Sequence, residues 1–256
     1  MRSVSLPQNP IIVIPARLAA SRLPNKPLAE IAGEPMVVHV WRCGMRAALG
    51  PVLVAAAEPE IARAVEAVGG RAVLTDPALP SGSDRAFAAV EQVDPDGRHD
   101  AVINLQSDIP TVAPEALRAV FDLLADPAVD IGTLALPVSD PRELDIPGAN
   151  KAVIALPLGA RAGRALYFSR NRVPSGEGPL YHHFGIYAFR REALARFVSL
   201  APSPLEQREK LEQLRALEAG MRIEVALVDS VPAEVNTPAD LEKARSLFRN
   251  HAAKQA

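Results

Sequence analysis

Cysteine is nearly absent from this 256-residue sequence, which contains only Cys43. A single thiol excludes an internal disulfide and any metal site built from several cysteines. Cys43 lies in a stretch with the spacing of an amphipathic helix, so the pattern favours a small buried core residue over a nucleophile.

Long apolar runs and a strong charge imbalance are also missing. No run approaches the length of a membrane span, and the opening MRSVSLPQNP lacks the apolar core of a secretion signal. The formal net charge is only −2, so nothing indicates a general nucleic-acid surface. We therefore expect a cytoplasmic protein with a flexible tail over residues 1–9, no nucleic acid partner and no membrane insertion.

Short apolar runs alternate with helical patterns along most of the chain. Strand-like runs cover residues 11–14, 52–56, 71–74, 101–105 and 131–136, and helical patterns cover residues 36–48, 61–68, 84–93 and 114–124. Because parallel strands need helical crossovers, this alternation predicts an α/β fold with a Rossmann-like, mostly parallel sheet and helices on both faces. Ligands of such sheets bind beyond the carboxyl ends of the strands.

The alternation breaks between about residues 140 and 190, where prolines and glycines separate short apolar runs. This pattern predicts a smaller antiparallel insertion, with strands near 152–156, 164–168 and 184–189. Helical patterns return at 204–219 and 238–249, with a strand-like run at 223–228 between them. We expect one α/β domain over 1–256 that carries an antiparallel subdomain at about 140–190.

The first predicted strand leads directly into a loop with three cations, Arg17, Arg22 and Lys26. At the carboxyl edge of a sheet, such a loop suits an anionic ligand such as a polyphosphate. The sequence contains neither GxxxxGK[ST] nor GxGxxG, so the loop is not a P-loop or a dinucleotide-binding loop. Considered alone, the three charges fit a solvated loop equally well.

Asp108 follows the apolar run AVINL and should therefore stand at the same edge, where a hard cation needs an oxygen ligand. An aspartate in this position could instead cap the next helix, but Pro110 and Pro114 intervene, so magnesium ligation is favoured. The segment PSGSDR reads as a turn in which Ser83 caps a helix. Arg85 fits either a nucleotide contact or an ion pair on the helix surface.

The segment IPARLAASRLPNKPLAEIAGEPMVVHV resembles the N-terminal signature of the sugar nucleotidyltransferases. It is most similar to that of the CMP-Kdo synthetase family, cytidylyltransferases that act on 3-deoxy-manno-octulosonate (Kdo) in lipopolysaccharide synthesis. Six further matches follow in the family's order: PSGSDR, INLQSDIP, ALYFSR, HHFGIYAF, PSPLEQREKLEQLRALEAG and VNTPADLEKAR. They span almost the whole chain, and ALYFSR and LEQLR make the resemblance specific to the Kdo enzymes.

The resemblance implies a nucleotide site and a metal site. Residues implied to bind CTP are Arg17, Arg22, Lys26, Ser81, Gly82, Arg85 and Gln106. The three loop cations would hold the triphosphate, and Ser81 and Gly82 would contact the cytosine edge. Gln106 would contact either the nucleotide or the sugar. Arg17, Lys26 and Asp108 would be the catalytic residues, and Asp108 and Asn236 would be ligands of Mg²⁺.

The resemblance also implies an acid-sugar site in the later part of the chain. Kdo carries a carboxylate, for which Arg170 is suited, and hydroxyls, for which the implied partners are Ser169, His183, Tyr187, Glu212 and Gln213. Tyr187 could equally be a sheet aromatic, and Glu212 could be a helix-surface acid. Strand alternation lets only one of His182 and His183 face the pocket, and the family pattern selects His183.

The implied reaction is attack by the anomeric hydroxyl of Kdo on the α-phosphorus of CTP, with no general base assigned. Two departures stand out: Ser107 replaces a common glycine, and Asn236 replaces the aspartate of VDTP by a neutral amide. The amide contributes less charge to a metal. The alternatives are therefore an enzyme for a modified Kdo or other acid sugar, or a weakly active binding homologue. We also expect a homodimer in which the antiparallel insertion forms the contact.

Overall fold

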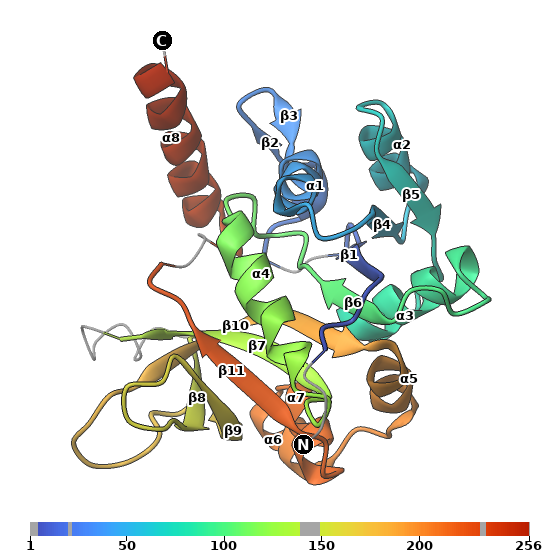
Figure 1. The fold of residues 1–256 in the computed structure, drawn as a ribbon. Coiled ribbons are helices and arrows are strands. Elements are labelled where there is room, and N and C mark those ends of the chain that lie inside the picture. Colours follow the sequence, from blue (N-terminus) through green and yellow to red (C-terminus); the bar gives the residue numbers. More distant parts are fainter. Residues whose placement is uncertain (1–4, 20–21, 139–148, 231–233, 256) are drawn as a thin grey trace. The chain divides into compact units, whose positions relative to one another are not determined.

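The structure is a computed structural model of the chain, and it describes residues 5–19, 22–138, 149–230 and 234–255. The chain divides into two compact units (Figure 1). Unit 1 comprises residues 1–8, 100–102 and 118–231, and unit 2 comprises residues 9–99, 103–117 and 232–256. The first four residues of the expected tail and the start of the expected insertion lie outside the described residues.

Unit 2 contains strands in the order β5-β4-β1-β6. Their bounds are β1 (Pro10–Ala16), β4 (Val52–Ala56), β5 (Arg71–Leu74) and β6 (Ala101–Asn104), the last of which begins in unit 1. The β1–β4 and β4–β5 pairs are parallel. Every residue of β1 is buried, as a parallel strand covered on both faces requires. The chain therefore becomes exposed only at Arg17, just past the carboxyl end of β1.

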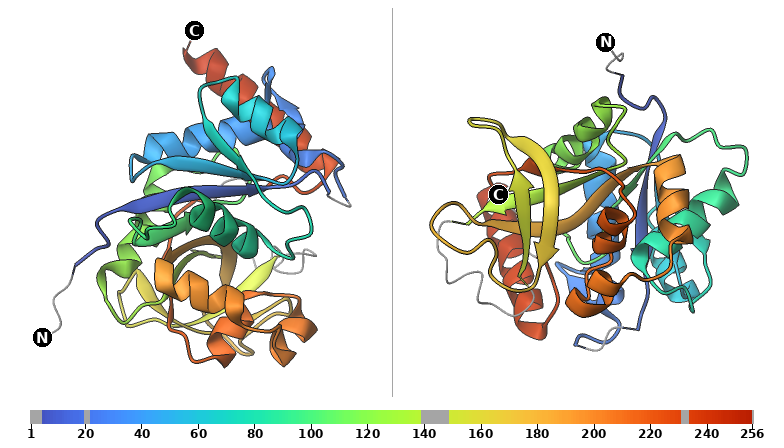
Figure 2. Two further views of the ribbon diagram at one scale, coloured as in Figure 1. Left: turned by 90° about the vertical axis from the view of Figure 1, so that its right-hand side faces the viewer. Right: turned by 90° about the horizontal axis from the view of Figure 1, so that it is seen from below.

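Helices cover both faces of this part of the sheet. Those of unit 2 are α1 (Met36–Ala47), α2 (Pro59–Glu66), α3 (Gly82–Val93) and α8 (Pro238–Gln255), with α4 (Pro114–Asp122) shared between the units. The short elements are η1 (Lys26–Leu28), β2 (Glu30–Ile31) and β3 (Glu34–Pro35). Helices α1 and α2 lie on one face of β1 and β4, and α3 lies on the other (Figure 2). This half matches the predicted parallel α/β pattern.

Unit 1 contradicts the expectation of a mostly parallel sheet. Its strands are β7 (Ile131–Pro137), β8 (Asn150–Ala155), β9 (Ala162–Ser169), β10 (Tyr181–Arg190) and β11 (Ile223–Leu227), in the order β10-β7-β11-β9-β8. Only β11–β7 is parallel among these pairs. A further antiparallel pairing of β10 with β8 closes these strands into a ring. The sheet is thus mixed, because most of its neighbours are joined without helical crossovers.

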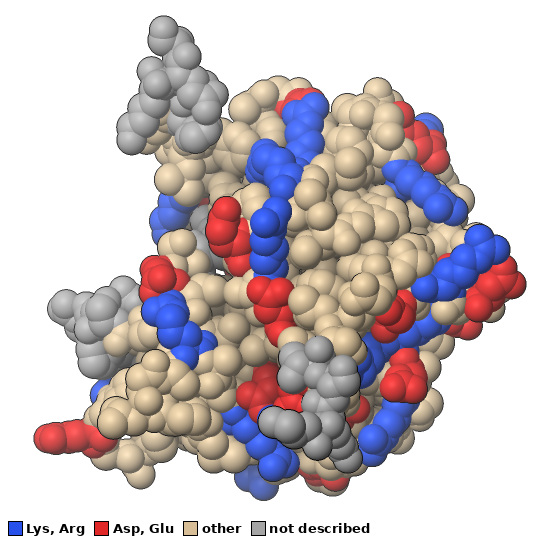
Figure 3. Space-filling model, in the orientation of Figure 1, with Lys and Arg blue, Asp and Glu red and all other residues tan. Residues whose placement is uncertain are grey.

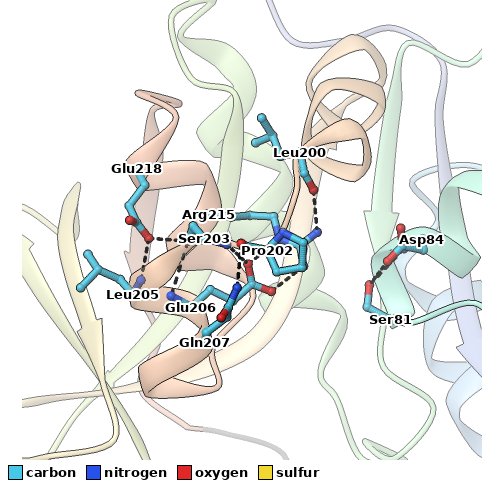
Figure 4. Close-up of polar contacts among 10 residues, drawn as sticks. All are labelled: Ser81, Asp84, Leu200, Pro202, Ser203, Leu205, Glu206, Gln207, Arg215 and Glu218. Carbon is cyan, nitrogen blue, oxygen red and sulfur yellow. Dashed lines mark hydrogen bonds and ion pairs between the residues drawn. The ribbon is translucent and has the colours of Figure 1, made fainter.

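The single helix predicted over 204–219 is wrong. Unit 1 contains η2 (Leu123–Ala125), α5 (Arg191–Ser199), α6 (Pro204–Glu209) and α7 (Gln213–Glu218). Helix α6 ends where Lys210 adopts a left-handed conformation with φ of 56°. Two charged links then fold α7 back on α6: Arg215 pairs with Glu206, and Glu218 accepts from Ser203 and from the backbone N–H of Leu205 (Figure 4). These tertiary contacts stabilise the break.

The other predicted helices and strands are present, and their ends differ by a few residues in most cases. None of the helices in the described residues is both long enough and apolar enough to cross a membrane. On the face shown in Figure 3, basic and acidic side chains are interspersed, with no broad field of one sign. This agrees with the small net charge of the sequence.

Candidate active site

A cavity of about 310 Å³ opens in unit 2 at the carboxyl ends of β1 and β6. Its volume lies at the lower end of the range for small-molecule sites, about 300–1,000 Å³. Every residue predicted to bind the nucleotide or the metal lines it: Arg17, Arg22, Lys26, Ser81, Gly82, Arg85, Gln106, Asp108 and Asn236. Residues far apart in the sequence therefore meet in one cavity, as the sheet-edge argument predicted.

The two arginines of the first loop are exposed at this cavity. The loop is fixed beside them, because the backbone N–H of Leu18 donates to Glu58 Oε2 at 2.9 Å. Neither Arg17 nor Arg22 forms an ion pair within the part of the chain that the structure describes. Their positive charge thus remains available to an anion that enters the cavity.

Lys26 joins Asp108 to Asn236. Its Nζ lies 2.7 Å from Asp108 Oδ2 and 3.3 Å from Asn236 Oδ1. The backbone explains this meeting, because the N–H of Val235 donates to the carbonyl oxygen of Asp108 at 2.9 Å. The ammonium group shows that these carboxylate and amide oxygens can be approached together by one cation.

Glu234 is a member of this cluster that the sequence analysis missed. Its Oε2 accepts a hydrogen bond from Asn236 Nδ2 at 3.2 Å. Burial, together with the negative charge of Asp108, raises the pKa of Glu234 to about 7. The only signal in the sequence was its position two residues before Asn236, which by itself indicates nothing about Asp108.

The start of α3 corrects one prediction about PSGSDR. The helix is capped by Ser81 and not by Ser83 (Figure 4). Ser81 Oγ accepts from the backbone N–H of Asp84 at 3.2 Å and donates to Asp84 Oδ2 at 2.6 Å. Ser83 is fully buried and accepts from Asn104 Nδ2 at 3.4 Å. The cap fixes Ser81 and the neighbouring Gly82 in the cavity wall.

Gly82 permits a close approach to Pro15. A Cβ at this position would lie 3.3 Å from Pro15 Cγ, closer than side chains ordinarily pack, and 3.4 Å from Gln106 Oε1, at the limit of ordinary contact. Ser107 does not have a positive φ. Serine is therefore accommodated there without left-handed strain.

Arg85 does not form the helix-surface ion pair that was one of its two interpretations. Its guanidinium Nη1 donates to Thr75 Oγ1 at 2.6 Å and to the carbonyl oxygen of Asp76 at 3.1 Å. Burial, and then the charge of Arg17, lower its pKa. Arg85 thus lines the cavity while fixing the loop that follows β5.

Unit 1 brings Ser169 and Arg170 to the end of α6. Arg170 Nε donates to the carbonyl oxygen of Glu209 at 2.6 Å, and Nη2 donates to that of Lys210 at 3.1 Å. Glu209, which the sequence analysis missed, accepts from Ser169 Oγ at 2.9 Å and from the backbone N–H of Arg170 at 2.9 Å. Burial opposes ionisation of Glu209, but the hydrogen bonds from Arg170, Ser169 and Tyr167 prevail and lower its pKa.

His183 and Gln213 are both 3% exposed in unit 1. His183 Nδ1 and Gln213 Nε2 are buried without a hydrogen-bond partner among the described residues. Buried polar atoms of this kind cost free energy unless a ligand or water satisfies them. The centre of the His183 ring lies 4.7 Å from the centre of the Phe168 ring and 5.8 Å from that of Tyr187. Phe168 is the chain neighbour of Ser169.

The positions of Tyr187 and Glu212 are compatible both with a sugar contact and with an ordinary structural role. Tyr187 is buried and also contacts the ring of Phe189 at 5.8 Å, as a sheet aromatic would. Glu212 is half-buried and immediately precedes α7. Their roles stay predictions.

Comparison with known proteins shows the family to which the chain belongs. A family model described as cytidylyltransferase matches residues 11–223. The 3-deoxy-manno-octulosonate cytidylyltransferase of Rhodospirillum centenum is 64% identical over 94% of this chain and 94% of its own, and that of Paramagnetospirillum magneticum is 59% identical over 94% and 98%. A solved structure of CMP:2-keto-3-deoxy-manno-octonic acid synthetase complexed with CTP is 36% identical, with a TM-score of 0.84 over 95% of this chain and 100% of the other. The chain therefore belongs to the cytidylyltransferase family, among the 3-deoxy-manno-octulosonate cytidylyltransferases.

Proposed function

We propose that this protein transfers the cytidylyl group of CTP to Kdo, forming CMP-Kdo for lipopolysaccharide synthesis and releasing pyrophosphate. The observation that carries this proposal is the cavity of unit 2, in which loop cations, a capped helix start and the Asp108 cluster meet. Relatives at 59% and 64% identity carry the same activity in their names, which supports the assignment.

The nucleotide occupies the cavity of unit 2. Arg17, Arg22 and Lys26 bind the triphosphate, and by spreading its charge they make pyrophosphate a better leaving group. Ser81, Gly82 and Gln106 lie at the start of α3 and beside it, where they contact the cytosine. Arg85 supports this wall through its hydrogen bonds to the loop after β5.

The donor set at Asp108 suits a magnesium ion, because carboxylate and amide oxygens are common protein ligands of this hard cation. Asp108 and Asn236 would hold it, and the Lys26 ammonium already stands between their oxygens. Glu234 adds a neighbouring carboxyl group that accepts from Asn236 Nδ2, and a bound cation would favour its ionised form. When bound, Mg²⁺ supplies charge neutralisation at the phosphates.

The acid sugar binds to residues of unit 1. Arg170 Nε and Nη2 donate hydrogen bonds to backbone carbonyl oxygens. These bonds hold the guanidinium group in place, and Nη1 remains to donate to the sugar carboxylate. Ser169, His183, Tyr187, Glu212 and Gln213 contact its hydroxyls. We assign no general base, so catalysis rests on positioning and charge neutralisation.

Two other functions use the same residues: transfer to a modified Kdo or another acid sugar, and nucleotide binding with weak turnover. Asn236 favours the second, because it brings less charge to the metal than aspartate. The deciding experiment measures pyrophosphate release with CTP or UTP across a panel of acid sugars, alongside calorimetric CTP binding. We expect release with CTP and Kdo. CTP binding without release for any sugar would instead identify a binding homologue.

The homodimer remains a prediction. Leu158 and Leu166, in and beside the antiparallel strands of unit 1, are large exposed apolar residues. The molar mass in solution, measured by light scattering during size-exclusion chromatography, tests the prediction directly.

A further inference from the structure

Thr133 on β7 is fully buried, and its hydroxyl has more neighbours than it has hydrogens. Thr133 Oγ1 lies 3.0 Å from His183 Nε2, 3.1 Å from the carbonyl oxygen of Phe184 and 2.9 Å from that of Ile186. The register of β10 against β7 shifts between Phe184 and Tyr187. Both carbonyls that face Thr133 belong to this irregular stretch of β10.

The tautomer of His183 follows from counting hydrogens. A hydroxyl has one hydrogen and can accept as well, whereas a carbonyl oxygen only accepts. If Thr133 donated to His183 Nε2, two carbonyl oxygens would face the hydroxyl oxygen at about 3 Å with no hydrogen between them. The hydroxyl hydrogen therefore goes to a carbonyl, and His183 Nε2 carries a hydrogen that it donates to Thr133.

The imidazole ring is neutral, so its second nitrogen has no hydrogen. Burial, followed by the charge of His182, lowers the pKa of His183 to about 3. With the single hydrogen on Nε2, Nδ1 is an acceptor. It is also the atom that is buried without a partner among the described residues.

We propose that Thr133 is a positioning residue that fixes His183 as its Nε2–H tautomer, so that Nδ1 selects acid sugars presenting a hydrogen-bond donor there. This inference rests on the sugar site proposed above. The proposal predicts which sugars bind. A sugar that places a hydroxyl or an amine against His183 Nδ1 binds, whereas a sugar that places only an acceptor there leaves Nδ1 unpaired. A buried polar atom left unpaired is a strong basis for rejection.

The tautomer can be measured without any substrate. Two-bond ¹H–¹⁵N spectra of histidine-labelled protein report which ring nitrogen carries the hydrogen, and His183→Asn identifies the signal by removing it. We expect the Nε2–H form in the wild type and in Thr133→Ser, which keeps the hydroxyl. In Thr133→Val, which is nearly the same size but can neither donate nor accept, we expect a mixture of tautomers. An Nδ1–H ring in the wild type would overturn the proposal.

The kinetic test separates positioning from folding. We expect Thr133→Val to raise KM for Kdo about tenfold or more, while KM for CTP stays within about twofold. Thr133→Ser should restore the wild-type KM. If Thr133→Val shows a mixture of His183 tautomers but its KM for Kdo equals that of the wild type, His183 does not select the sugar. Should Thr133→Val fail to fold, Kdo analogues with one hydroxyl replaced by fluorine give the same test in the wild type, because fluorine cannot donate.

In that analogue series, one position should lose about tenfold or more in kcat/KM, and Thr133→Ser should show the same loss. Equal behaviour of all analogues would overturn the specificity claim. Failure of the proposed function is distinguishable, because the wild type would then turn over no acid sugar although its tautomer signal is unchanged.

Discussion

At the scale of single residues, Asp108 concentrates the chemistry proposed for the cavity of unit 2. Its side chain is 23% exposed and pairs with Lys26, which is 16% exposed. Asp108→Asn keeps the shape and removes the charge that a hard cation needs. We expect turnover to fall about a hundredfold or more, with unchanged circular dichroism. The exposed Asp96→Asn, which breaks a surface pair with Arg98, is the matched control and should retain full activity.

At Asn236 we predict that a substitution strengthens metal binding instead of weakening it. Asn236→Asp adds a carboxylate beside Asp108, so it should lower the magnesium concentration at half-maximal turnover and leave the preference for CTP over UTP unchanged. Manganese binding followed by electron paramagnetic resonance reads out the same affinity without turnover. Glu234→Gln keeps an acceptor for the Asn236 amide but removes charge, and should weaken the metal. If neither variant changes the magnesium concentration at half-maximal turnover, residues 234 and 236 do not belong to the metal site.

Arg170 tests the sugar site in unit 1. Arg170→Ala removes the charge-assisted contact proposed for the sugar carboxylate, a type of contact worth about 1.5–3 kcal/mol, so KM for Kdo should rise about tenfold to a hundredfold. KM for CTP should change far less. Steady-state kinetics with each substrate varied in turn measure both values, with the nearby exposed Arg172→Ala as control. An equal loss for both substrates would mean that Arg170 serves the nucleotide or the fold.

At the scale of elements, the pairing of α6 with α7 shapes the segment that carries Glu209, Glu212 and Gln213. Arg215 Nε donates to Glu206 Oε2 at 2.7 Å, and the two side chains are only 10% and 12% exposed. The Arg215 guanidinium also lies 5.3 Å from the centre of the Phe197 ring. A charge pair that is this buried becomes costly when one partner is lost.

We therefore expect Arg215→Ala to lower the free energy of unfolding by about 3 kcal/mol, measured by urea denaturation. Arg208→Ala, on the exposed face of α6, should change it by no more than about 0.5 kcal/mol. The double variant Glu206→Gln with Arg215→Met should lose less than Arg215→Ala, because no buried charge is left unpaired. Similar losses for Arg215→Ala and Arg208→Ala would show that the pair contributes nothing beyond a surface contact.

At the scale of the whole molecule, His183 links folding to pH. Its pKa falls from an ordinary 6.5 to about 3 in the folded chain. Between these values the unfolded chain binds the proton and the folded chain does not, so the contribution of this ring to stability is complete above pH 6.5 and declines as the pH falls toward 3. The slope is at most about 1.4 kcal/mol per pH unit for this ring.

Urea denaturation at several pH values between 7 and 5 measures this loss. His183→Asn should be less stable than the wild type at pH 7 but should show a shallower decline below pH 6.5. His99 is half-buried in unit 2, and His99→Gln serves as the control. This variant should show the same change of stability with pH as the wild type. An unchanged slope in His183→Asn would mean that the ring is protonated in the folded protein.

The sequence by itself determined most of the elements and many of the residues that line the cavity of unit 2. Its apolar runs and helical spacings are local patterns, and each one reports which face of a segment is buried. The position of Arg17 after β1 and of Asp108 after β6 follows from the same patterns, because parallel strands present their carboxyl ends at one edge. The family motifs then selected the residues among many polar candidates.

Only the tertiary structure decided how those elements pair and which distant side chains meet. The mixed sheet and the closure of β10 on β8 depend on which apolar faces fit together, for which no local pattern exists. The break at Lys210 is stabilised by Arg215 and Glu206, so the helical spacing of 204–219 could not reveal it. Burial, followed by the negative charge of Asp108 on another segment, raises the pKa of Glu234. Electrostatic and hydrogen-bond partners of this kind are set by distance in space, which the order of residues along a chain does not specify.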